Sequence, residues 1–321
     1  MIYSIKNKAR NLSHKNILVK KLYLLANRTK VSLLHGLSDK KFAKMNYKAN
    51  TGKTLNLENP TTFNEKLWWL KLNNRDPLLT ICSDKYKVRE YVKECGLEHI
   101  LTKLYGVYDN ADDINFEELP NRAFIKTNHG SGTNIIWDRN KPFDKNKFRK
   151  RFNKSLKQNY YWQSREWNYK NIEPRIIVEE FLEDKENKLL VDYRFLCFDG
   201  VVKMVLADIE TAAEDGSHSP YAKRNVYDKE FNFLNIKIAR EQFDVSLAKK
   251  PKNYETMIKY AEILSRPFPH CRVDLYNIDG KIYFGEITFY HGGACHNINP
   301  PEWDKKMGDW IDLNSEKIKL V

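Results

Sequence analysis

Cysteine is scarce in this sequence of 321 residues: the five cysteines are far apart and none forms a Cys-x-x-Cys pair. This usage argues against a disulfide scaffold or a structural zinc site, and it fits reduced thiols in a cytosol. Long apolar runs are also missing, because no stretch approaches the roughly 18 residues that a membrane-spanning helix needs. The basic first residues lack an apolar stretch followed by a small-residue cleavage site, so we expect no secretory signal. The sequence therefore predicts a cytoplasmic protein.

Positive charge is plentiful, and it is concentrated at one end. Residues 1–53 contain thirteen Lys and Arg side chains and one acid, Asp39, which gives this arm a net +12 of the chain's +13. One interpretation is that the arm lies on anionic lipid headgroups at the inner face of the membrane, where each basic residue adds about 1 kcal/mol. The alternative is a solvated helix that packs Leu18, Leu22 and Leu25 on the body of the protein. Few aromatic residues accompany the charge, so nucleic acid is not an expected partner.

Helix signals divide the chain into three parts. A polar connector ends at Pro60, and Thr62 with Glu65 forms a capping-box pattern that starts a helix. A second helix is expected over 83–94, ended by Gly96 in a Schellman-like position. The expected parts are a basic helical arm over 1–60, a helical region over 61–120 and the main domain over 121–321.

Short strands dominate the main domain. They are expected at 123–126, 134–137, 175–181, 193–198, 201–207, 272–277 and 282–289, with a helix at 254–264. Asp199-Gly200 joins two of these strands as a tight hairpin turn, and the polar stretch 208–240 is expected to be a mobile substrate loop. Strands joined by hairpins predict an α+β fold with antiparallel sheets, not a doubly wound dinucleotide fold.

A candidate phosphate-binding loop follows the first of these strands. Lys126 ends the strand, and the loop continues as His129-Gly130-Ser131-Gly132. Backbone N–H groups of such a loop can approach phosphate oxygens, and the lysine adds a point charge. The pattern is not a Walker A sequence, because the lysine precedes the glycines. On its own, a Gly-Ser-Gly segment after a strand also fits a simple turn.

The last hairpin (residues 272–289, the acid hairpin) carries Arg272 and Asp274 on one strand and Glu286 on the other. A three-residue turn at 278–280 would bring the two carboxylates onto one face, whereas a two-residue turn at 279–280 would separate them. Adjacent carboxylates repel unless a cation lies between them, and oxygen ligands suit a Mg²⁺ ion that bridges substrate phosphates. A salt bridge between the arginine and one acid is the other interpretation.

A third pattern lies in the strand that begins at Ile176. It runs through Glu179, Glu180 and Phe181 to Leu182. An apolar strand with this ending can line a slot for a purine, or it can be a buried strand that emerges into solvent.

In their order along the chain, these three patterns resemble the ATP-grasp superfamily, and most closely its TupA-like branch, which is associated with teichuronopeptide and polysaccharide biosynthesis. The resemblance covers residues 62–308. It is carried by the stretches FNEKLWWLKL, DKYKVREYV, FIKTNHGSG, YYWQSREWNYKNIEPRIIVEEFL, DYRFLCFDG and RVDLYNIDGKIYFGEITFY. It implies an ATP-grasp fold, in which two α+β subdomains with antiparallel sheets clasp ATP.

The resemblance also implies roles for individual residues. Those that would bind ATP are Lys85, Lys126, His129, Gly130, Ser131, Gly132, Glu179, Glu180, Phe181, Leu182 and Asp192. Those that would bind Mg²⁺ are Asp274, Glu286 and Thr288. Arg272 would steady the transferred phosphoryl group, and Arg272 and Lys126 would be the catalytic residues that stabilise the developing charge. Thr288 stands where the superfamily usually has Asn, and His291 stands where a proline is common.

The implied reaction joins a carboxylate to an amine. The carboxylate attacks the γ-phosphate of ATP to form an acyl phosphate, and the amine then displaces phosphate to give an amide. No nucleophilic side chain is needed, because both reacting groups belong to substrates. The expected partners are a uronic acid or amino acid and an amine, on a capsular or other cell-surface polysaccharide, a teichuronopeptide-type polymer or its precursor.

An aromatic and basic block precedes the third pattern. Arg165, Trp167, Tyr169 and Lys170 are candidates for binding a carboxylate substrate, because aromatic faces with cationic groups suit a uronic acid. Aromatic packing at a joint between subdomains is the other interpretation. His291, Cys295 and His296 cluster near the acid hairpin, although zinc sites usually have more ligands at tighter spacing.

Other functions stay open at this point. A glycosyltransferase would typically carry an Asp-x-Asp-like motif on a parallel fold, and none stands out. An ATP-grasp kinase that phosphorylates a sugar would use the same nucleotide site with an alcohol as acceptor. A non-catalytic binding module would keep its function without Asp274 and Glu286.

Overall fold

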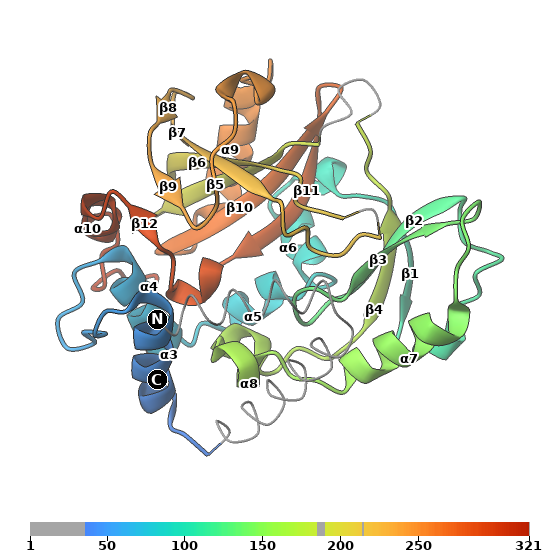
Figure 1. Ribbon diagram of the computed structural model, residues 1–321, viewed down its shortest axis with the longest axis horizontal. Helices are drawn as coiled ribbons and strands as arrows, with labels where there is room; N and C mark the ends of the chain where they lie inside the picture. Colours follow the sequence, from blue (N-terminus) through green and yellow to red (C-terminus); the bar gives the residue numbers. More distant parts are fainter. Residues whose placement is uncertain (1–35, 185–189, 214, 321) are drawn as a thin grey trace.

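The computed structural model describes residues 36–184, 190–213 and 215–320, and Figure 1 shows their arrangement. Residues 1–35, most of the basic arm, lie outside the described residues, so the membrane-binding interpretation stays a prediction. In the part of the chain that the structure describes, no helix has the length and apolar character to cross a bilayer.

Helices come first in the described chain. They are α3 (Asp39–Thr51), α4 (Phe63–Asn73), α5 (Pro77–Ser83), α6 (Val88–Glu94) and the short η1 (Glu98–Ile100). The expected capping box starts α4: the Thr62 side chain accepts a hydrogen bond from the Glu65 N–H, and the Glu65 carboxylate accepts one from the Thr62 N–H. Two donors at the start of the helix are thereby satisfied.

The prediction of one helix over 83–94 is wrong at its N-terminal end. Ser83 instead ends α5, and α6 begins only at Val88. Asp84 lies between the two helices and accepts hydrogen bonds from the N–H groups of Tyr86 and Lys87, so its side chain competes with helix continuation. The predicted C-terminal end of this helix is confirmed. Gly96 has φ 75°, and the chain there makes both hydrogen bonds of a Schellman motif: Gly96 N–H to Lys93 O, and Leu97 N–H to Val92 O.

The smaller sheet has four antiparallel strands. In sequence they are β1 (Leu104–Tyr108), β2 (Arg122–Thr127), β3 (Asn134–Asp138) and β4 (Ile176–Glu180), and their order in the sheet is β1-β4-β2-β3. The basic helix α7 (Lys145–Leu156) covers one face, where Phe148 and Phe152 pack with Ile125 and Val178. The connections include the short helices η2 (Ala111–Asp113), α8 (Tyr161–Ser164) and η3 (Trp167–Tyr169).

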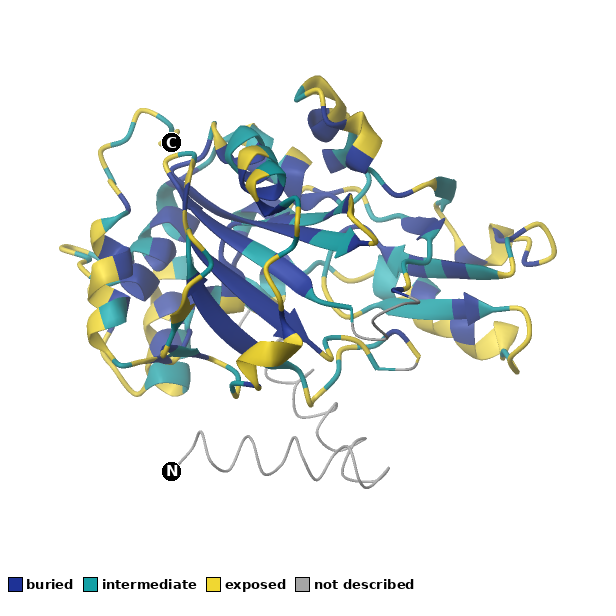
Figure 2. Ribbon diagram, turned by 90° about the horizontal axis from the view of Figure 1, so that it is seen from above, coloured by how far each residue is buried: buried dark blue, intermediate teal, exposed yellow. Residues whose placement is uncertain are grey.

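The larger sheet has six antiparallel strands. They are β5 (Asp192–Phe198), β6 (Val201–Ile209), β7 (Lys223–Asp228), β8 (Phe233–Leu234), β10 (His270–Ile278) and β11 (Lys281–Thr288), in the order β11-β10-β5-β6-β7-β8. Helix α9 (Tyr254–Ser265) packs on β5, β6 and β10, and Figure 2 shows how much of this sheet is buried. The expected Asp199-Gly200 turn joins β5 to β6, with φ 52° and 83° at its two residues.

The polar stretch 208–240 is not the mobile substrate loop that the sequence predicts. It contains β7, β8 and β9 (Lys237–Ile238), and β9 pairs with β12 (Ile298–Asn299). The sequence pattern did not predict β7, because Arg224 and Asn225 are polar although they are buried. Each has a hydrogen-bond partner inside the fold. The remaining elements are η4 (Val245–Leu247), η5 (His291–Ala294) and α10 (Glu302–Asp309).

Together these elements confirm an α+β fold with antiparallel sheets. The helices after residue 60 share one apolar core with the six-stranded sheet, in which Phe63 and Trp68 lie with Phe195 and Leu196. The division at residues 60 and 120 stays a prediction about domains.

Candidate functional site

A cavity of about 270 Å³ lies between the two sheets. The sequence-predicted residues that line it are Lys85, Lys126, Gly130, Ser131, Gly132, Glu179, Glu180, Phe181, Leu182, Asp192, Asp274 and Glu286. Residues from β2, β4, β5, β10 and β11 therefore meet in one place, although they are far apart in the sequence.

Lys126 and Glu179 form an ion pair on the smaller sheet. The lysine Nζ on β2 lies 2.6 Å from Glu179 Oε2 on β4, and Arg89 from α6 approaches the other oxygen at 3.3 Å. Glu179 thus lies between two cations, which fixes Lys126 at the cavity wall.

Lys85 connects the glycine-rich loop to the acid hairpin. Its Nζ donates a hydrogen bond to the Gly130 carbonyl at 2.8 Å and lies 4.0 Å from Glu286 Oε2. Burial lowers the pKa of Lys85, although Glu286 opposes this effect. A lysine in this position can add positive charge at the loop.

His129 has a different position from the rest of the loop. It is buried, its Nε2 interacts with the Ser155 carbonyl at 3.1 Å, and it is not among the residues that line the cavity. It therefore anchors the loop to the end of α7. The loop's polar contact toward the cavity comes from Ser131, whose hydroxyl lies 3.1 Å from His218 Nε2. His218 lines the cavity and was missed, because it lies in the stretch taken for a mobile loop.

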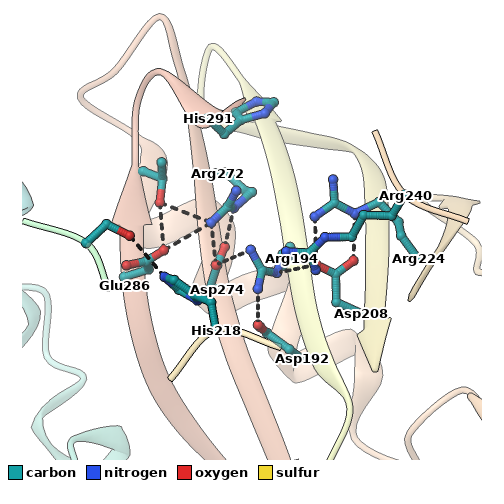
Figure 3. Close-up of polar contacts among 12 residues, drawn as sticks. Asp192, Arg194, Asp208, His218, Arg224, Arg240, Arg272, Asp274, Glu286 and His291 are labelled. Atoms are coloured by element: carbon teal, nitrogen blue, oxygen red, sulfur yellow. Dashed lines mark hydrogen bonds and ion pairs between the residues drawn. The ribbon is translucent and has the colours of Figure 1, made fainter. Parts of the chain in front are cut away.

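The acid hairpin holds a guanidinium group between its carboxylates. Arg272 contacts both oxygens of Asp274, at 2.6 and 2.7 Å, and its Nη2 lies 3.1 Å from Glu286 Oε1 and 3.2 Å from Thr288 Oγ1 (Figure 3). Thr288 also donates to Glu286 Oε1 at 3.1 Å. Burial alone would raise the pKa of Glu286, but Lys85 and Arg272 lower it to about 2, so this carboxylate is charged at neutral pH.

A β-bulge gives the hairpin this geometry. The turn has two residues, since Ile278 pairs with Lys281, and this register alone would put Asp274 and Glu286 on opposite faces. A register shift between Asp274 and Leu275 restores the pairing of Asp274 with Glu286. Gly285 lies at the shift, and a Cβ there would be 3.0 Å from the Asp274 carbonyl oxygen. The hairpin therefore has the two-residue turn, which was expected to separate the carboxylates, and yet its carboxylates converge.

Sequence analysis missed a row of ion pairs that continues from the acid hairpin across the larger sheet (Figure 3). Arg194 on β5 contacts Asp192, lies 3.6 Å from Asp274 Oδ2 and 3.0 Å from Asp208 Oδ2. Asp208 is fully buried and is also held by Arg224 and Arg240, each at 2.6 Å. The signal was present, because Asp192 and Arg194 alternate in an otherwise apolar strand.

The four candidate residues of the aromatic and basic block lie in different surroundings. Arg165 is 1% exposed, and its guanidinium lies over the rings of Phe42 and Trp162, while Trp167 lies under Arg75 and Lys170 is exposed. Tyr169 differs, because the charges that act on its phenol come from Glu166, Glu286 and Arg272. The phenol of Tyr169 therefore lies in the electrostatic field of the acid hairpin.

Three histidines form a buried chain beside Arg272. His291 lies 3.2 Å from His270 Nε2 through its own Nε2, and 2.9 Å from His296 Nε2 through its Nδ1. Cys295 is outside this chain and lies 3.9 Å from the Asn46 amide. The imidazoles bond to one another in a row, so their nitrogens do not converge on one point.

Oxygen ligands for a metal are present at the acid hairpin. Asp274 and Glu286 are adjacent, and the Glu286 side chain is 38% exposed at the cavity. Over residues 36–184, 190–213 and 215–320, no group of three or more His, Cys, Asp or Glu side chains could hold a metal ion by itself. Mg²⁺ commonly binds through one or two carboxylates together with substrate phosphates, and this pair fits such a shared site.

Comparisons with known proteins give the family. The family model described as TupA-like ATPgrasp matches residues 65–312. No curated protein matches the chain in sequence. Among solved structures it is similar to D-alanine–D-alanine ligase from Bacillus anthracis (16% identity over 66% of this chain and 59% of that one, TM-score 0.39). It is also similar to L-amino acid ligase from Bacillus licheniformis (14%, 71% and 49%, 0.42) and biotin carboxylase from Campylobacter jejuni (14%, 77% and 51%, 0.40). The chain thus spans about half to three fifths of the length of these relatives. Because the family model covers most of its length, this chain belongs to the TupA-like ATP-grasp family.

Proposed function

We propose that this protein is an ATP-dependent carboxylate–amine ligase that forms an amide through an acyl phosphate. The observation that carries the proposal is the convergence of Lys85, Lys126, Asp274 and Glu286 on one cavity between the sheets, with Arg272 bound to both carboxylates. The ATP-grasp fold implies ATP binding, and phosphoryl transfer depends on positive charge placed around the phosphates.

The nucleotide would lie with its phosphates toward the lysines. Lys126 is paired with Glu179, lines the cavity and would contact phosphate oxygens. The end of β4, with Glu180, Phe181 and Leu182, would bind adenine, and Asp192 would accept from the ribose. These assignments agree with the residues that line the cavity.

The acid hairpin would act on the transferred group. A Mg²⁺ ion held by Asp274 and Glu286 would neutralise phosphate charge when bound. Arg272, oriented by both oxygens of Asp274, would stabilise the charge that develops on the γ-phosphoryl oxygens. The buried Asp274 keeps this guanidinium in one orientation.

The reaction has two balanced steps. The substrate carboxylate forms a bond to the γ-phosphorus, and the bond from that phosphorus to the bridging oxygen breaks, which releases ADP. The amine nitrogen then bonds to the acyl carbon, the bond from carbon to the phosphate oxygen breaks, and the amine loses a proton. The enzyme supplies orientation and charge stabilisation.

Thermal unfolding with nucleotides tests the ATP site. With Mg²⁺, ATP at 100 times its dissociation constant should add about 2.7 kcal/mol of stability, and Lys126→Ala should remove most of this effect. Lys147→Ala, an exposed lysine on α7, is the matched control and should respond like the wild type. Stabilisation by UDP-glucose but not by ATP would contradict the proposal and favour the glycosyltransferase.

Hydroxylamine distinguishes the ligase from the kinase. An acyl phosphate reacts with hydroxylamine to give a hydroxamate, whereas a phosphorylated sugar does not. We expect hydroxamate and ADP when the enzyme is supplied with ATP, hydroxylamine and carboxylates such as D-glucuronate or L-glutamate. ADP release with a neutral sugar alone would indicate the kinase. ADP release that is unchanged in Asp274→Asn and Glu286→Gln would remove the site assignment.

The biological target would be a cell-surface polysaccharide, a teichuronopeptide-type polymer or its precursor. The basic arm would then hold the enzyme at anionic lipid, where lipid-linked glycans are assembled. Deletion of residues 1–35 tests this arm and spares α3, which buries Phe42 and Tyr47 in the core. Unchanged partition onto phosphatidylglycerol vesicles after the deletion would contradict the membrane role.

A further inference from the structure

His218 lines the cavity, and the proposed chemistry has not used it. It lies in the connection between β6 and β7 of the larger sheet, and it borders the same cavity as Glu286. Its Nε2 lies 3.1 Å from the hydroxyl of Ser131, which belongs to the glycine-rich loop between β2 and β3 of the smaller sheet (Figure 3). Two side chains that come from different sheets therefore meet at the cavity.

Residues 215–219, here called the strap, bind to the smaller sheet. The N–H of Ile136 on β3 donates to the Asp215 carbonyl at 3.1 Å, and the Asn134 side chain donates to the Gly216 carbonyl at 2.7 Å. Strand β3 is at the edge of its sheet, so it has backbone groups free for such contacts. A segment that connects two strands of the larger sheet is thus attached to the smaller one.

The close approach of the strap to β3 depends on Gly216. This residue has φ 83°, and a Cβ there would lie 2.9 Å from the Ile136 nitrogen and 3.1 Å from the Ile135 carbonyl carbon. Any other residue would have to adopt a left-handed conformation and push against the strand backbone. The contact between strap and strand therefore depends on this glycine.

The backbone that carries His218 is held on both sides of it. The Ser219 N–H donates to the Thr211 carbonyl at 3.1 Å, and the Ser217 carbonyl accepts from the Ala213 N–H at 2.8 Å. The strap therefore has a defined conformation of its own, which aims the His218 ring at the glycine-rich loop.

His218 contacts the part of the loop that is expected to cover the phosphates. Besides the hydrogen bond to Ser131, its Cδ2 would lie 3.5 Å from a Cβ placed on Gly132. All three residues are exposed, and all three line the cavity. The ring thus lies against two consecutive residues of the loop at the mouth of the cavity.

Further contacts hold the loop from the helices. Arg151 of α7 donates to the carbonyls of Gly132 and Asn134, at 3.2 and 3.3 Å, and Lys85 donates to the Gly130 carbonyl. These contacts fix carbonyl groups of the loop and of the start of β3, whereas the strap connects a loop side chain to the larger sheet. A nucleotide between the two sheets would be enclosed by this connection.

We propose that His218 is a positioning residue for the nucleotide phosphates: through Ser131 it holds the glycine-rich loop over the cavity and connects it to the larger sheet. A loop that is already ordered loses less conformational entropy when a ligand binds, so this contact should tighten nucleotide binding. The inference rests on the proposed function and adds a residue of the larger sheet to the expected phosphate-binding loop.

Titration calorimetry with Mg²⁺ and a non-hydrolysable ATP analogue measures this role. His218→Ala should raise the dissociation constant about three- to tenfold, the range expected for the loss of one hydrogen bond. His218→Gln keeps a side-chain amide that can bond to Ser131 and should recover part of the loss. Tyr221→Ala is the matched control, because Tyr221 lies in the same connection, is 76% exposed and does not line the cavity.

A double-mutant cycle tests whether His218 acts through Ser131. Ser131→Ala should weaken binding of the analogue by itself, and addition of His218→Ala should cause little further loss, because the two residues share one interaction. Both side chains are exposed, so the free variants should melt close to the wild type.

Gly216→Ala tests the strap by a second route. The added Cβ would push the strap away from β3, so the dissociation constant of the analogue should rise as it does in His218→Ala. Gly52→Ala is the matched control, because Gly52 has φ 75° and a Cβ there meets nothing within 4 Å.

The outcomes separate this inference from the proposed function. An unchanged dissociation constant in His218→Ala, or losses that add in full in the double variant, would overturn the inference while ATP binding by the wild type stands. A His218→Gln variant as weak as His218→Ala would assign the effect to the shape of the imidazole and would also overturn it. A wild type that does not bind the analogue would overturn the proposed function itself.

Discussion

Asp274 and Glu286 lie directly opposite each other on β10 and β11, although the turn between these strands has two residues. Such a turn alone places an even-numbered residue opposite an odd-numbered one. The bulge at Gly285 inserts one residue and brings both carboxylates to the same side, with Arg272 between them. The charge arrangement of the site thus depends on a residue with no side chain.

Substitution of Gly285 should therefore disturb the site. A Cβ at this position would lie 3.0 Å from the Asp274 carbonyl oxygen and 3.2 Å from the Tyr276 ring. We expect Gly285→Val to lower the free energy of unfolding by about 1–3 kcal/mol through overpacking and to reduce ATP-dependent turnover at least tenfold. Gly36→Ala, where an added Cβ meets nothing within 4 Å, is the control. Wild-type turnover in the valine variant would show that the bulge is dispensable.

Arg272 should be needed for turnover more than for nucleotide binding. Its planar group contacts both oxygens of Asp274 and one oxygen of Glu286, a geometry that lysine cannot reproduce. We expect Arg272→Lys to lower kcat on the order of 100-fold, a loss typical of a group that stabilises transition-state charge. Stabilisation by ATP in thermal unfolding should persist. A variant that loses ATP stabilisation but keeps kcat would reverse this assignment.

Asp208 should contribute strongly to stability. It is 0% exposed and binds three arginines. Burial alone would raise the pKa of Asp208, but Arg224 and Arg194 hold it below its usual range. Asp208→Asn leaves buried guanidinium groups without their anion, and we expect a loss of about 3–5 kcal/mol in denaturant unfolding. Asp109→Asn, at a side chain that is 82% exposed, should change little. Equal stability of the two variants would contradict the importance of this ion-pair row.

The buried histidines should make the protein sensitive to mild acid. Burial lowers the pKa of His270 and of His296 to about 3, and burial with the neighbouring imidazoles lowers the pKa of His291 well below its usual value. The unfolded chain therefore binds more protons below about pH 6.5, so stability is full above that pH and falls as the pH drops toward 3.

Denaturant unfolding at pH 7.5, 6.0 and 5.0 measures this effect. We expect a loss of about 1 kcal/mol per histidine between pH 6 and pH 5. His291→Asn should flatten the profile. A profile for His291→Asn as steep as that of the wild type would assign the acid sensitivity to other groups.

Local features of the fold could be predicted from the sequence. The capping box at Thr62, the Schellman motif at Gly96 and the Asp199-Gly200 turn are all present. Each depends on hydrogen bonds and dihedral angles within a few residues, so the residue types nearby are sufficient. The start of α6 was wrong because Asp84 forms its own local hydrogen bonds, which periodicity does not register.

The residue pattern was sufficient to predict the α+β class, the family resemblance and many of the residues around the cavity. Which of these residues meet depends on the tertiary structure: His129 anchors a loop, and Arg165 packs in an aromatic cluster. The row from Asp274 through Arg194 to Asp208 depends on the pairing of three strands. Strand register and bulges depend on the packing of the whole sheet. A shift of one residue in the register moves every side chain of a strand to the opposite face of the sheet.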